Sequence, residues 1–150
     1  MKLMLVCTSN ICRSAMGHAL MEKRVKELNK DIEVYSCGIY AGTGDKATNS
    51  AIQTMKQYNV DLLNHRATNI HDSNIEDMDL ILCATVSHKN AILEFYPEVK
   101  EKLYTIKEYA NYDPNGLDKD IKDPYGWDME TYERCAKEIV ECVELILKKL

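Results

Sequence analysis

The stretch LMLVCTSNICRSA, residues 3–15, joins an apolar run to a short polar segment and then to a helical pattern. Leu3 to Val6 have the character of a buried strand that ends at Cys7, and the helical pattern begins at about Ser14. The polar segment is therefore the loop of a strand–loop–helix unit. Such units build α/β folds, in which ligands bind at the carboxyl ends of parallel strands. Cys7 occupies one of these strand ends.

The rest of the chain continues the alternation of strands and helices. Apolar runs predict three more strands, over residues 31–38, 79–84 and 102–106. Periodic patterns predict four helices, over about 14–29, 47–60, 87–97 and 128–150, the last with Asp128 as its N-cap. The sequence thus predicts a three-layer α/β fold in one domain over residues 1–150, with a four-stranded parallel sheet and helices on both faces.

Charge and composition argue against several classes of partner. The net charge of the 150 residues is −5, and no basic stripe of the kind that binds nucleic acid is present. No apolar run approaches the roughly 20 residues of a membrane span. The apolar segment at the N-terminus is also shorter than that of a secretory signal, which needs about 7–15 residues. We therefore expect a cytoplasmic protein that binds neither nucleic acid nor membranes.

The six cysteines give no metal-binding spacing, since no C-x-x-C pair occurs. Four of them lie in apolar surroundings and are interpreted as small buried hydrophobic residues: Cys37, Cys83, Cys135 and Cys142. No metal and no cofactor is predicted. Cys7 and Cys12 remain as the cysteines with chemical interest.

The loop after Cys7 has the composition of an oxyanion site. Backbone N–H groups of such a loop can converge on an anion, and the following helix adds the partial positive charge of its N-terminus. Arg13 can place a planar guanidinium against two oxygens of the same anion. A thiol in these surroundings is expected to have a lowered pKa and to act as a nucleophile. C-x5-R followed by Ser is the signature of the cysteine-dependent phosphatases.

A candidate acid lies in the irregular, Asp-, Pro- and Gly-rich stretch over residues 110–127. Loops of this length in a compact domain are usually functional or mobile. Asp123 of the segment KDPYG is the preferred candidate, and Asp120 is its rival.

VCTSNICRS near the N-terminus and DPY near the C-terminus together resemble the low-molecular-weight protein tyrosine phosphatase family. The segments YSCGIYA, NHRA and DLILCA and the final helix also fall where that family has counterparts, and TIKEYA looks most like its bacterial branch. Two positions depart from the family pattern. Ser9 stands where the family usually has Gly, which matters if the position needs a positive φ, and Ala15 stands where it usually has Pro.

The resemblance implies a phosphocysteine mechanism. Cys7 thiolate attacks phosphorus, Arg13 and the loop amides hold the phosphoryl oxygens, and Asp123 protonates the departing oxygen and then activates water. The phosphate loop is completed by Thr8, Ser9, Asn10, Ile11 and Cys12.

The resemblance also implies supporting contacts around the loop. Ser14 hydrogen-bonds the Cys7 thiolate, and Asn10, Ser36 and His65 belong to a network that fixes the loop. Simpler interpretations remain open: Ser14 as a helix N-cap, Asn10 as a residue that tolerates a left-handed turn, and His65 as a structural histidine. The other histidines, His18, His71 and His88, are predicted at the surface.

Cys12 shares the loop with Cys7 and is a candidate for redox protection. A neighbouring thiol can trap a sulfenic acid as a disulfide before it oxidises further. The family resemblance implies such reversible inactivation through Cys7 and Cys12, and the alternative is that Cys12 is an inert loop residue.

The expected substrate is phosphotyrosine in a protein or peptide, with phosphate and vanadate as ligands and a monomeric enzyme. Tyr40, Tyr125 and Trp127 are predicted to form an aromatic wall for a phenyl ring. Protein arginine phosphatases of the bacterial branch carry Thr where this chain has Ile11, and an apolar residue suits a phenyl ring better than a phosphoguanidinium.

Two further alternatives are weaker. An arsenate reductase needs an extra cysteine pair near Cys83, and this chain has none there. A non-catalytic phosphotyrosine-binding module would have no need for Cys7, Ser14 and Asp123 together.

Overall fold

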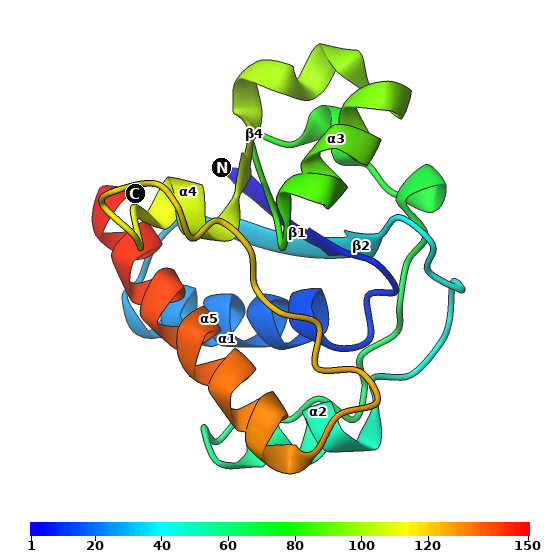
Figure 1. Cartoon of the computed structure of the whole chain (residues 1–150), viewed down its shortest axis with the longest axis vertical. Coiled ribbons are helices and arrows are strands. Elements are labelled where there is room, and N and C mark those ends of the chain that lie inside the picture. Colours follow the sequence, from blue (N-terminus) through cyan, green and yellow to red (C-terminus); the bar gives the residue numbers. More distant parts are fainter.

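The computed structural model describes residues 1–150 and shows a parallel sheet between two layers of helices (Figure 1). The four strands are β1 (Lys2–Cys7), β2 (Glu33–Gly38), β3 (Leu80–Cys83) and β4 (Leu103–Thr105). They lie in the order β2-β1-β3-β4, and every pair is parallel. The predicted three-layer α/β fold is confirmed.

The alternation of side chains along β1 supplies both cores of the molecule. Leu3 and Leu5 pack into one apolar cluster, and Met4 and Val6 pack into the other on the opposite face of the sheet. All four side chains are essentially inaccessible to solvent. β1 is therefore the central strand, and its carboxyl end holds Cys7 in a rigid position.

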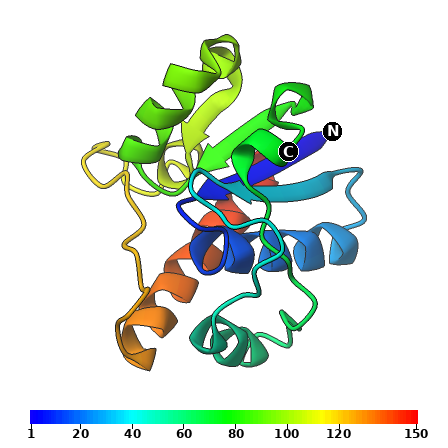
Figure 2. The same ribbon diagram turned by 90° about the vertical axis from the view of Figure 1, so that its right-hand side faces the viewer.

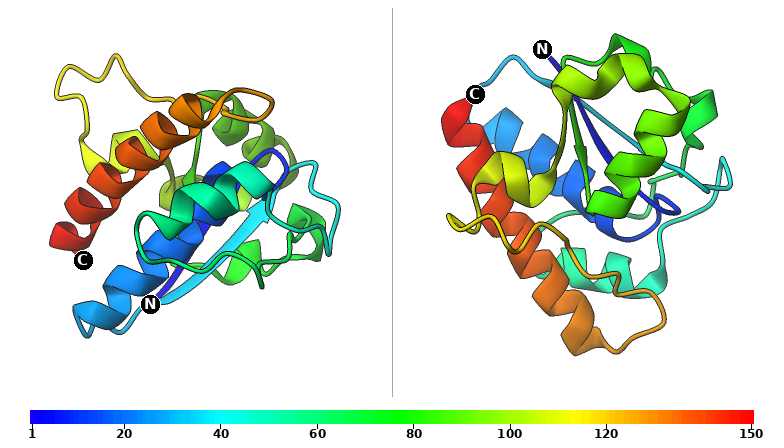
Figure 3. Two further views of the ribbon diagram at one scale, coloured as in Figure 1. Left: turned by 90° about the horizontal axis from the view of Figure 1, so that it is seen from below. Right: turned by 45° about the horizontal axis from the view of Figure 1, so that its top comes forward.

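The two faces of the sheet carry different helices (Figure 2). One face is covered by α1 (Arg13–Glu27), α2 (Asn49–Lys56), α4 (Ile106–Ala110) and α5 (Met129–Lys149). The other is covered by α3 (Val86–Phe95) and three short 3-10 helices, η1 (Ile70–Asp72), η2 (Ile75–Asp77) and η3 (Pro97–Lys102). The larger of the two apolar clusters lies under α1 and α5, and these two helices pack side by side (Figure 3).

Side-chain caps fix where several helices begin. The predicted N-cap of α5 is confirmed, because Asp128 accepts a hydrogen bond from the Thr131 amide at 3.0 Å. Helix α4 was not predicted. Its five residues are too few to show a period, although Thr105 and Glu108 form a reciprocal capping box at its start.

Residues 111–128 contain no helix and no strand, as the sequence predicts. This segment crosses the carboxyl ends of β1 and β3 before it enters α5 (Figures 1 and 3). It therefore faces the loop that follows β1. None of the helices has both the length and the apolar character needed to cross a membrane.

Candidate active site

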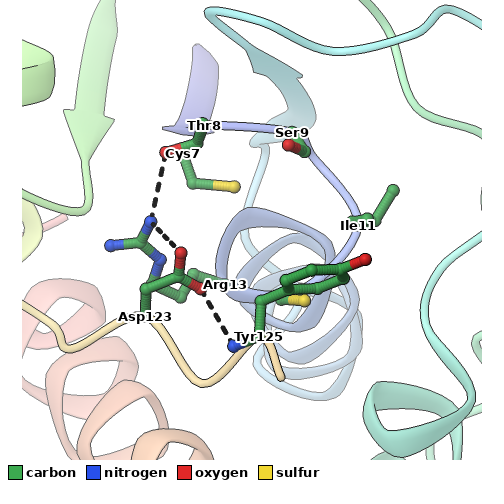
Figure 4. A pocket seen from close by; sticks show the side chains of 8 residues that line it. Cys7, Thr8, Ser9, Ile11, Arg13, Asp123 and Tyr125 are labelled. Atoms are coloured by element: carbon green, nitrogen blue, oxygen red, sulfur yellow. Dashed lines mark hydrogen bonds and ion pairs between the residues drawn. The ribbon is translucent and has the colours of Figure 1, made fainter. Parts of the chain in front are cut away.

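The loop between β1 and α1 forms the wall of a pocket of about 340 Å³. Cys7 lies at its floor with 2% of its surface exposed, and its Sγ points into the cavity (Figure 4). Residues 111–128 form the opposite side of the pocket, through Asp123 and Tyr125. The pocket is lined by Cys7, Thr8, Ser9, Ile11, Cys12, Arg13, Asp123 and Tyr125.

The Cys7 sulfur is held by a chain of polar contacts from the first turn of α1. Its Sγ lies 3.0 Å from Oγ of Ser14, and Asn10 Nδ2 donates to the same Ser14 oxygen at 2.7 Å. Ser14 is inside the helix, whose N-cap is Cys12, so the interpretation of Ser14 as an N-cap is wrong. Because Asn10 already donates to its oxygen, the Ser14 hydroxyl proton can go to the Cys7 sulfur at 3.0 Å or to the Cys37 carbonyl at 3.5 Å, and the shorter contact favours the sulfur.

Arg13 is oriented by two of its three nitrogens. Its Nη1 donates to the Ile121 carbonyl at 2.9 Å, and its Nη2 donates to Thr8 Oγ1 at 3.3 Å. Its Nε is buried and has no hydrogen-bond partner in the protein. A buried donor without a partner is costly, and an acceptor that reaches Nε from the neighbouring pocket would remove this cost. An oxyanion fits this place.

The start of α1 adds further donors at the same place. No side chain caps this helix, and its first turn holds no acidic residue. The backbone N–H groups of the loop and of the first helical turn therefore remain available to an anion.

Asn10 fixes the backbone of the loop from behind. It adopts φ of 58°, its Oδ1 accepts from the Thr68 amide at 3.0 Å, and its carbonyl oxygen lies 2.7 Å from Nε2 of His65. Asn10 therefore combines a left-handed turn with the predicted contact to His65. Ser36 does not reach the loop: its hydroxyl pairs with His18 at 2.7 Å, and the His18 and His65 rings meet edge to face at 6.4 Å.

Burial affects both of these histidines. Desolvation lowers the pKa of His18 and that of His65 below the ordinary value for histidine. A neutral His65 ring donates its Nε2 proton to the Asn10 carbonyl and needs no charge to do so.

The backbone of the phosphate loop depends on Gly38 rather than on residue 9. Ser9 is not among the residues with positive φ, so a serine there carries no strain. A Cβ on Gly38 would lie 2.7 Å from the Thr8 carbonyl oxygen and 2.8 Å from the Asn10 nitrogen. Ala15, the second departure from the family pattern, is fully buried in the core beneath α1.

Asp123 faces Arg13 across the pocket. Its Oδ2 lies 3.7 Å from Arg13 Nη2, and its Oδ1 accepts from the Tyr125 amide at 3.1 Å (Figure 4). The carboxyl group is about half exposed, so it can exchange protons with solvent. Asp120 is occupied elsewhere, since its Oδ1 accepts from the amide of Val86 at the start of α3 at 2.8 Å.

The segment that carries Asp123 is anchored at two points that precede this residue. Ile121 is fully buried, and its amide donates to the Ala84 carbonyl at 2.9 Å. Further back, the buried Lys107 ammonium binds Asp118 at 2.9 Å and Glu138 at 3.0 Å. These contacts hold residues 118–123, called the acid loop below, against the end of β3 and against α5.

Cys12 lies at the pocket wall but turns its sulfur toward the core. Its Sγ is 3.2 Å from the Tyr132 hydroxyl and 3.7 Å from Oγ1 of Thr48. Burial raises the pKa of the Cys12 thiol. All cysteines are free, and the four that were predicted to be buried are buried.

The aromatic wall is smaller than predicted. Tyr125 lines the pocket together with Ile11, whereas Tyr40 and Trp127 do not. Tyr40 is 77% exposed on the bend after β2, and the ring of Trp127 is covered by the Lys122 ammonium at 4.0 Å from its centroid. Tyr40 is nevertheless close to the loop through its backbone, since its amide donates to the Thr8 carbonyl at 2.8 Å.

His88 was predicted at the surface, and this is wrong. Only 8% of its surface is exposed, and its Nε2 lies 2.8 Å from Thr8 Oγ1 in the phosphate loop. Its Nδ1 lies 2.9 Å from Oγ1 of Thr85, the N-cap of α3. A polar residue in the first turn of a helix that directly follows β3 could have indicated this contact, because β3 is paired with β1.

No three His, Cys, Asp or Glu side chains lie close enough together to hold a metal ion. The polar groups of the pocket instead surround one thiol with donors from the backbone, from Arg13 and from Ser14.

Comparison with known proteins identifies the family. Residues 2–150 match the family described as low molecular weight phosphotyrosine protein phosphatase. The protein-arginine-phosphatase of Geobacillus stearothermophilus is 33% identical over 99% of this chain and 95% of its own length. The low molecular weight protein tyrosine phosphatase from T. tengcongensis superposes with a TM-score of 0.92 at 35% identity, covering 100% of this chain and 99% of its own.

A third similar structure is a cysteine-to-serine mutant of the YwlE arginine phosphatase with a phosphorylated active site serine. It superposes with a TM-score of 0.93 at 28% identity and covers 100% of this chain and 95% of its own. Fold, pocket and sequence agree: the chain belongs to the low molecular weight phosphotyrosine protein phosphatase family and is a phosphatase.

Proposed function

We propose that this enzyme hydrolyses phosphotyrosine in proteins or peptides through a phosphocysteine intermediate on Cys7. The observation that carries the proposal is the unpaired, buried Nε of Arg13 beside a thiol at the pocket floor. A phosphoryl group that accepts from this nitrogen and from the loop amides presents its phosphorus to the Cys7 sulfur. The phosphorylated serine in the YwlE mutant supports transfer to this position.

Ser14 and Asp123 complete the proposed reaction. The Ser14 hydroxyl, 3.0 Å from the sulfur, stabilises Cys7 as a thiolate before attack and as a leaving group afterwards. Asp123 gives its proton to the departing phenolic oxygen and then takes a proton from the water that cleaves the phosphocysteine. Its half-exposed carboxyl group lines the same pocket as Cys7, where it can reach a leaving group (Figure 4).

The pocket wall favours a phenyl leaving group. Ile11 and Tyr125 both line the cavity (Figure 4) and offer apolar contact to a flat ring. Because Cys7 is only 2% exposed at the floor, a long side chain is needed to bring a phosphoryl group to it. Phosphoserine is too short to fill this depth.

Phosphoarginine is the second candidate substrate. It is favoured by the similarity to protein-arginine-phosphatases, one of which is 33% identical to this chain. The wall also carries the Ser9 hydroxyl, which can accept from a guanidinium N–H. Ile11 opposes this candidate, since it leaves other N–H groups of the leaving group unpaired.

Turnover of phosphotyrosine, phosphoarginine and phosphoserine peptides of the same sequence tests the proposal. We expect the highest kcat/KM for phosphotyrosine and almost none for phosphoserine. Ile11→Thr is expected to shift the ratio toward phosphoarginine, and Tyr125→Ala to weaken phosphotyrosine selectively. A wild type that prefers phosphoarginine would exclude phosphotyrosine as the main substrate. An unchanged ratio of the two activities in Ile11→Thr would show that Ile11 does not determine the preference.

Orthovanadate is expected to inhibit as a phosphate analogue. We further propose that the enzyme is a monomer and that it works in the cytoplasm. Its free thiols support the second of these, because the cytoplasm keeps thiols reduced. Sedimentation of the purified protein tests the monomer.

A further inference from the structure

We propose that His88 is a positioning residue for Arg13: it accepts the hydroxyl proton of Thr8 and thereby holds the Thr8 oxygen as a fixed acceptor for the guanidinium. This inference rests on the role proposed for Arg13 in binding the phosphoryl group. It concerns a residue on α3 that lies 80 positions away from the phosphate loop in the sequence.

The contacts form one continuous chain. Arg13 Nη2 donates to Thr8 Oγ1 at 3.3 Å, and the same oxygen lies 2.8 Å from Nε2 of His88. On the other side of the ring, Nδ1 lies 2.9 Å from Oγ1 of Thr85, which also accepts from the His88 amide at 3.1 Å. The ring is thus bound at both nitrogens and cannot turn freely.

The charge state of the ring sets the direction of this chain. Burial, assisted by the nearby Arg13, lowers the pKa of His88 to about 4, although Asp123 and Asp120 act in the opposite sense. The imidazole is therefore neutral near pH 7 and offers one acceptor nitrogen and one donor nitrogen. Both threonine oxygens can serve either role, so two tautomers are geometrically possible.

One tautomer aligns all the hydrogen bonds. With the proton on Nδ1, the ring donates to Thr85 and accepts the Thr8 proton at Nε2, while the Thr8 oxygen accepts from Arg13. Donors then run in one direction from Arg13 to Thr85, and each bond polarises the next. In the other tautomer the Thr8 oxygen receives N–H groups from both Arg13 and His88, and the run of donors that begins at the charged Arg13 stops at Thr8. Either tautomer leaves one threonine hydroxyl proton without a partner in this chain, that of Thr85 in the first and that of Thr8 in the second, so it is the polarisation by Arg13 that favours the first.

The functional consequence lies in the plane of the guanidinium. The Ile121 carbonyl holds Nη1 and Thr8 holds Nη2, so two fixed acceptors define the orientation of a rigid, planar group. This orientation leaves Nε as the buried, unpaired donor. Loss of the Thr8 acceptor frees one edge of the plane and misaligns Nε with the phosphoryl oxygens.

Substitution of His88 provides the kinetic test. His88→Leu removes the acceptor and is expected to lower kcat by about 10-fold to 100-fold, as misplacement of a binding group does, and to weaken vanadate binding. His88→Gln can keep an acceptor toward Thr8 and is expected to recover most of kcat. The control is His71→Leu, since His71 is exposed, pairs with Tyr96 and lies outside the pocket.

The pair of Thr8 and His88 gives a second, independent test. Thr8→Val is expected to lower kcat about as much as His88→Leu, and the double variant should be no worse than the poorer single one. Losses that multiply in the double variant, or equal losses in His88→Leu and His88→Gln, would mean that His88 only supports the fold.

Nitrogen NMR of the wild-type protein tests the tautomer without any turnover. We expect a protonated Nδ1 and an unprotonated Nε2 at pH 7, with Nε2 gaining a proton only near pH 4. A protonated Nε2 at pH 7 overturns the proposal, whatever the activities are. A failure of the proposed function is seen separately, as turnover that survives in Cys7→Ser.

Discussion

Arg13 and Asp123 lie side by side in the pocket but differ in their partners and in their exposure to solvent. Arg13 has a protein partner at each Nη nitrogen and none at Nε, so Nε is the donor that is left for a ligand. Asp123 approaches this guanidinium but remains half exposed. A carboxyl group in that position can both meet a leaving group and exchange protons with water.

Asp123→Asn is expected to lower kcat on phosphotyrosine by about 10²–10⁴-fold, because an amide cannot protonate the phenolic oxygen. The loss should shrink for a nitrophenolate leaving group, which needs no proton. Steady-state kinetics with both substrates measures this difference.

Asp120→Asn is the matched control, since it lies three residues earlier in the same loop. An asparagine keeps the oxygen that accepts from Val86, so kcat should stay within a few-fold of wild type. If Asp120→Asn showed the leaving-group dependence and Asp123→Asn did not, the acid would be Asp120.

Cys12 is expected to protect Cys7 from irreversible oxidation. Mild peroxide converts the Cys7 thiolate to a sulfenic acid, and the Cys12 thiol condenses with it to a disulfide and water. Reductant should then restore wild-type activity, whereas Cys12→Ser should recover little. Peptide mapping identifies the disulfide, and full recovery of Cys12→Ser would show that Cys12 has no protective role.

For single residues, the sequence predicts contacts between residues that are close along the chain better than contacts between residues that are far apart in it. Cys7, Arg13 and Ser14 could be predicted because a strand, a loop and a helix start follow one another within a few residues. His88 could not, since its contact with Thr8 depends on the pairing of β1 with β3. Tyr40 and Trp127 were placed in the wall because they are aromatic, but residue type alone does not say where a loop leads.

Among the elements, β2 determines the shape of the phosphate loop. Its last residue, Gly38, lies against the backbone of Thr8 and Asn10, and its amide donates to the Thr68 carbonyl at 2.9 Å. The amides of Ile39 and Tyr40 then donate to the carbonyls of Cys7 and Thr8 at 3.0 Å and 2.8 Å. The first two residues of the loop are thus bonded to the segment that follows β2.

Gly38→Ala is expected to lower kcat/KM by at least about tenfold, because its Cβ would lie within 3 Å of loop backbone atoms that set the anion site. Gly17→Ala is the control in α1. The added Cβ would lie 3.5 Å from the Leu5 side chain, which is an ordinary van der Waals distance. In a helix interior alanine is more favourable than glycine by about 1 kcal/mol.

Activity and thermal unfolding of both variants measure the effect. We expect Gly17→Ala to be active and at least as stable as wild type. Full activity in Gly38→Ala would mean that the loop does not depend on close packing against β2.

Most of the helices and strands could be predicted because the spacing of apolar residues in a helix differs from that in a strand. The continuous apolar run of β3 and the long amphipathic stripe of α5 are unambiguous. The five-residue α4 and the 3-10 helices are shorter than the window in which a period can be recognised. The order β2-β1-β3-β4 is a property of the three-dimensional packing and was not predicted.

For the molecule as a whole, the far end of the chain supports the pocket. Tyr132 on α5 reaches Cys12 and Thr48 with its hydroxyl, at 3.2 Å and 3.1 Å, and Lys107 ties the acid loop to the same helix through Glu138. The bidentate contact of Arg24 with Glu144 joins α1 to α5. Folding of the C-terminal helix is therefore linked to the geometry of a loop near the N-terminus.

The buried His88 and the half-buried His18 and His65 predict how stability changes with pH. Burial lowers the pKa of His18, of His65 and of His88, the last to about 4. Between about pH 6.5 and pH 4 the unfolded chain therefore binds more protons than the folded protein. The free energy of unfolding should fall by about 1–3 kcal/mol from pH 7 to pH 5.

Denaturant titrations at both pH values measure this fall, and it should be smaller in His88→Gln. Equal free energies of unfolding at pH 7 and pH 5 would show that the three rings protonate as easily in the folded protein as in the unfolded chain.

The central claim is that Cys7 carries the phosphoryl group during turnover. The most direct test mixes Asp123→Asn with nitrophenyl phosphate, whose leaving group needs no acid, and quenches the reaction within the first turnover. Because the second step lacks its base, we predict that mass spectrometry finds one phosphoryl group on the peptide that contains Cys7, and none when Cys7→Ala is added. A burst of nitrophenolate with no adduct, or an adduct on another residue, would contradict this account.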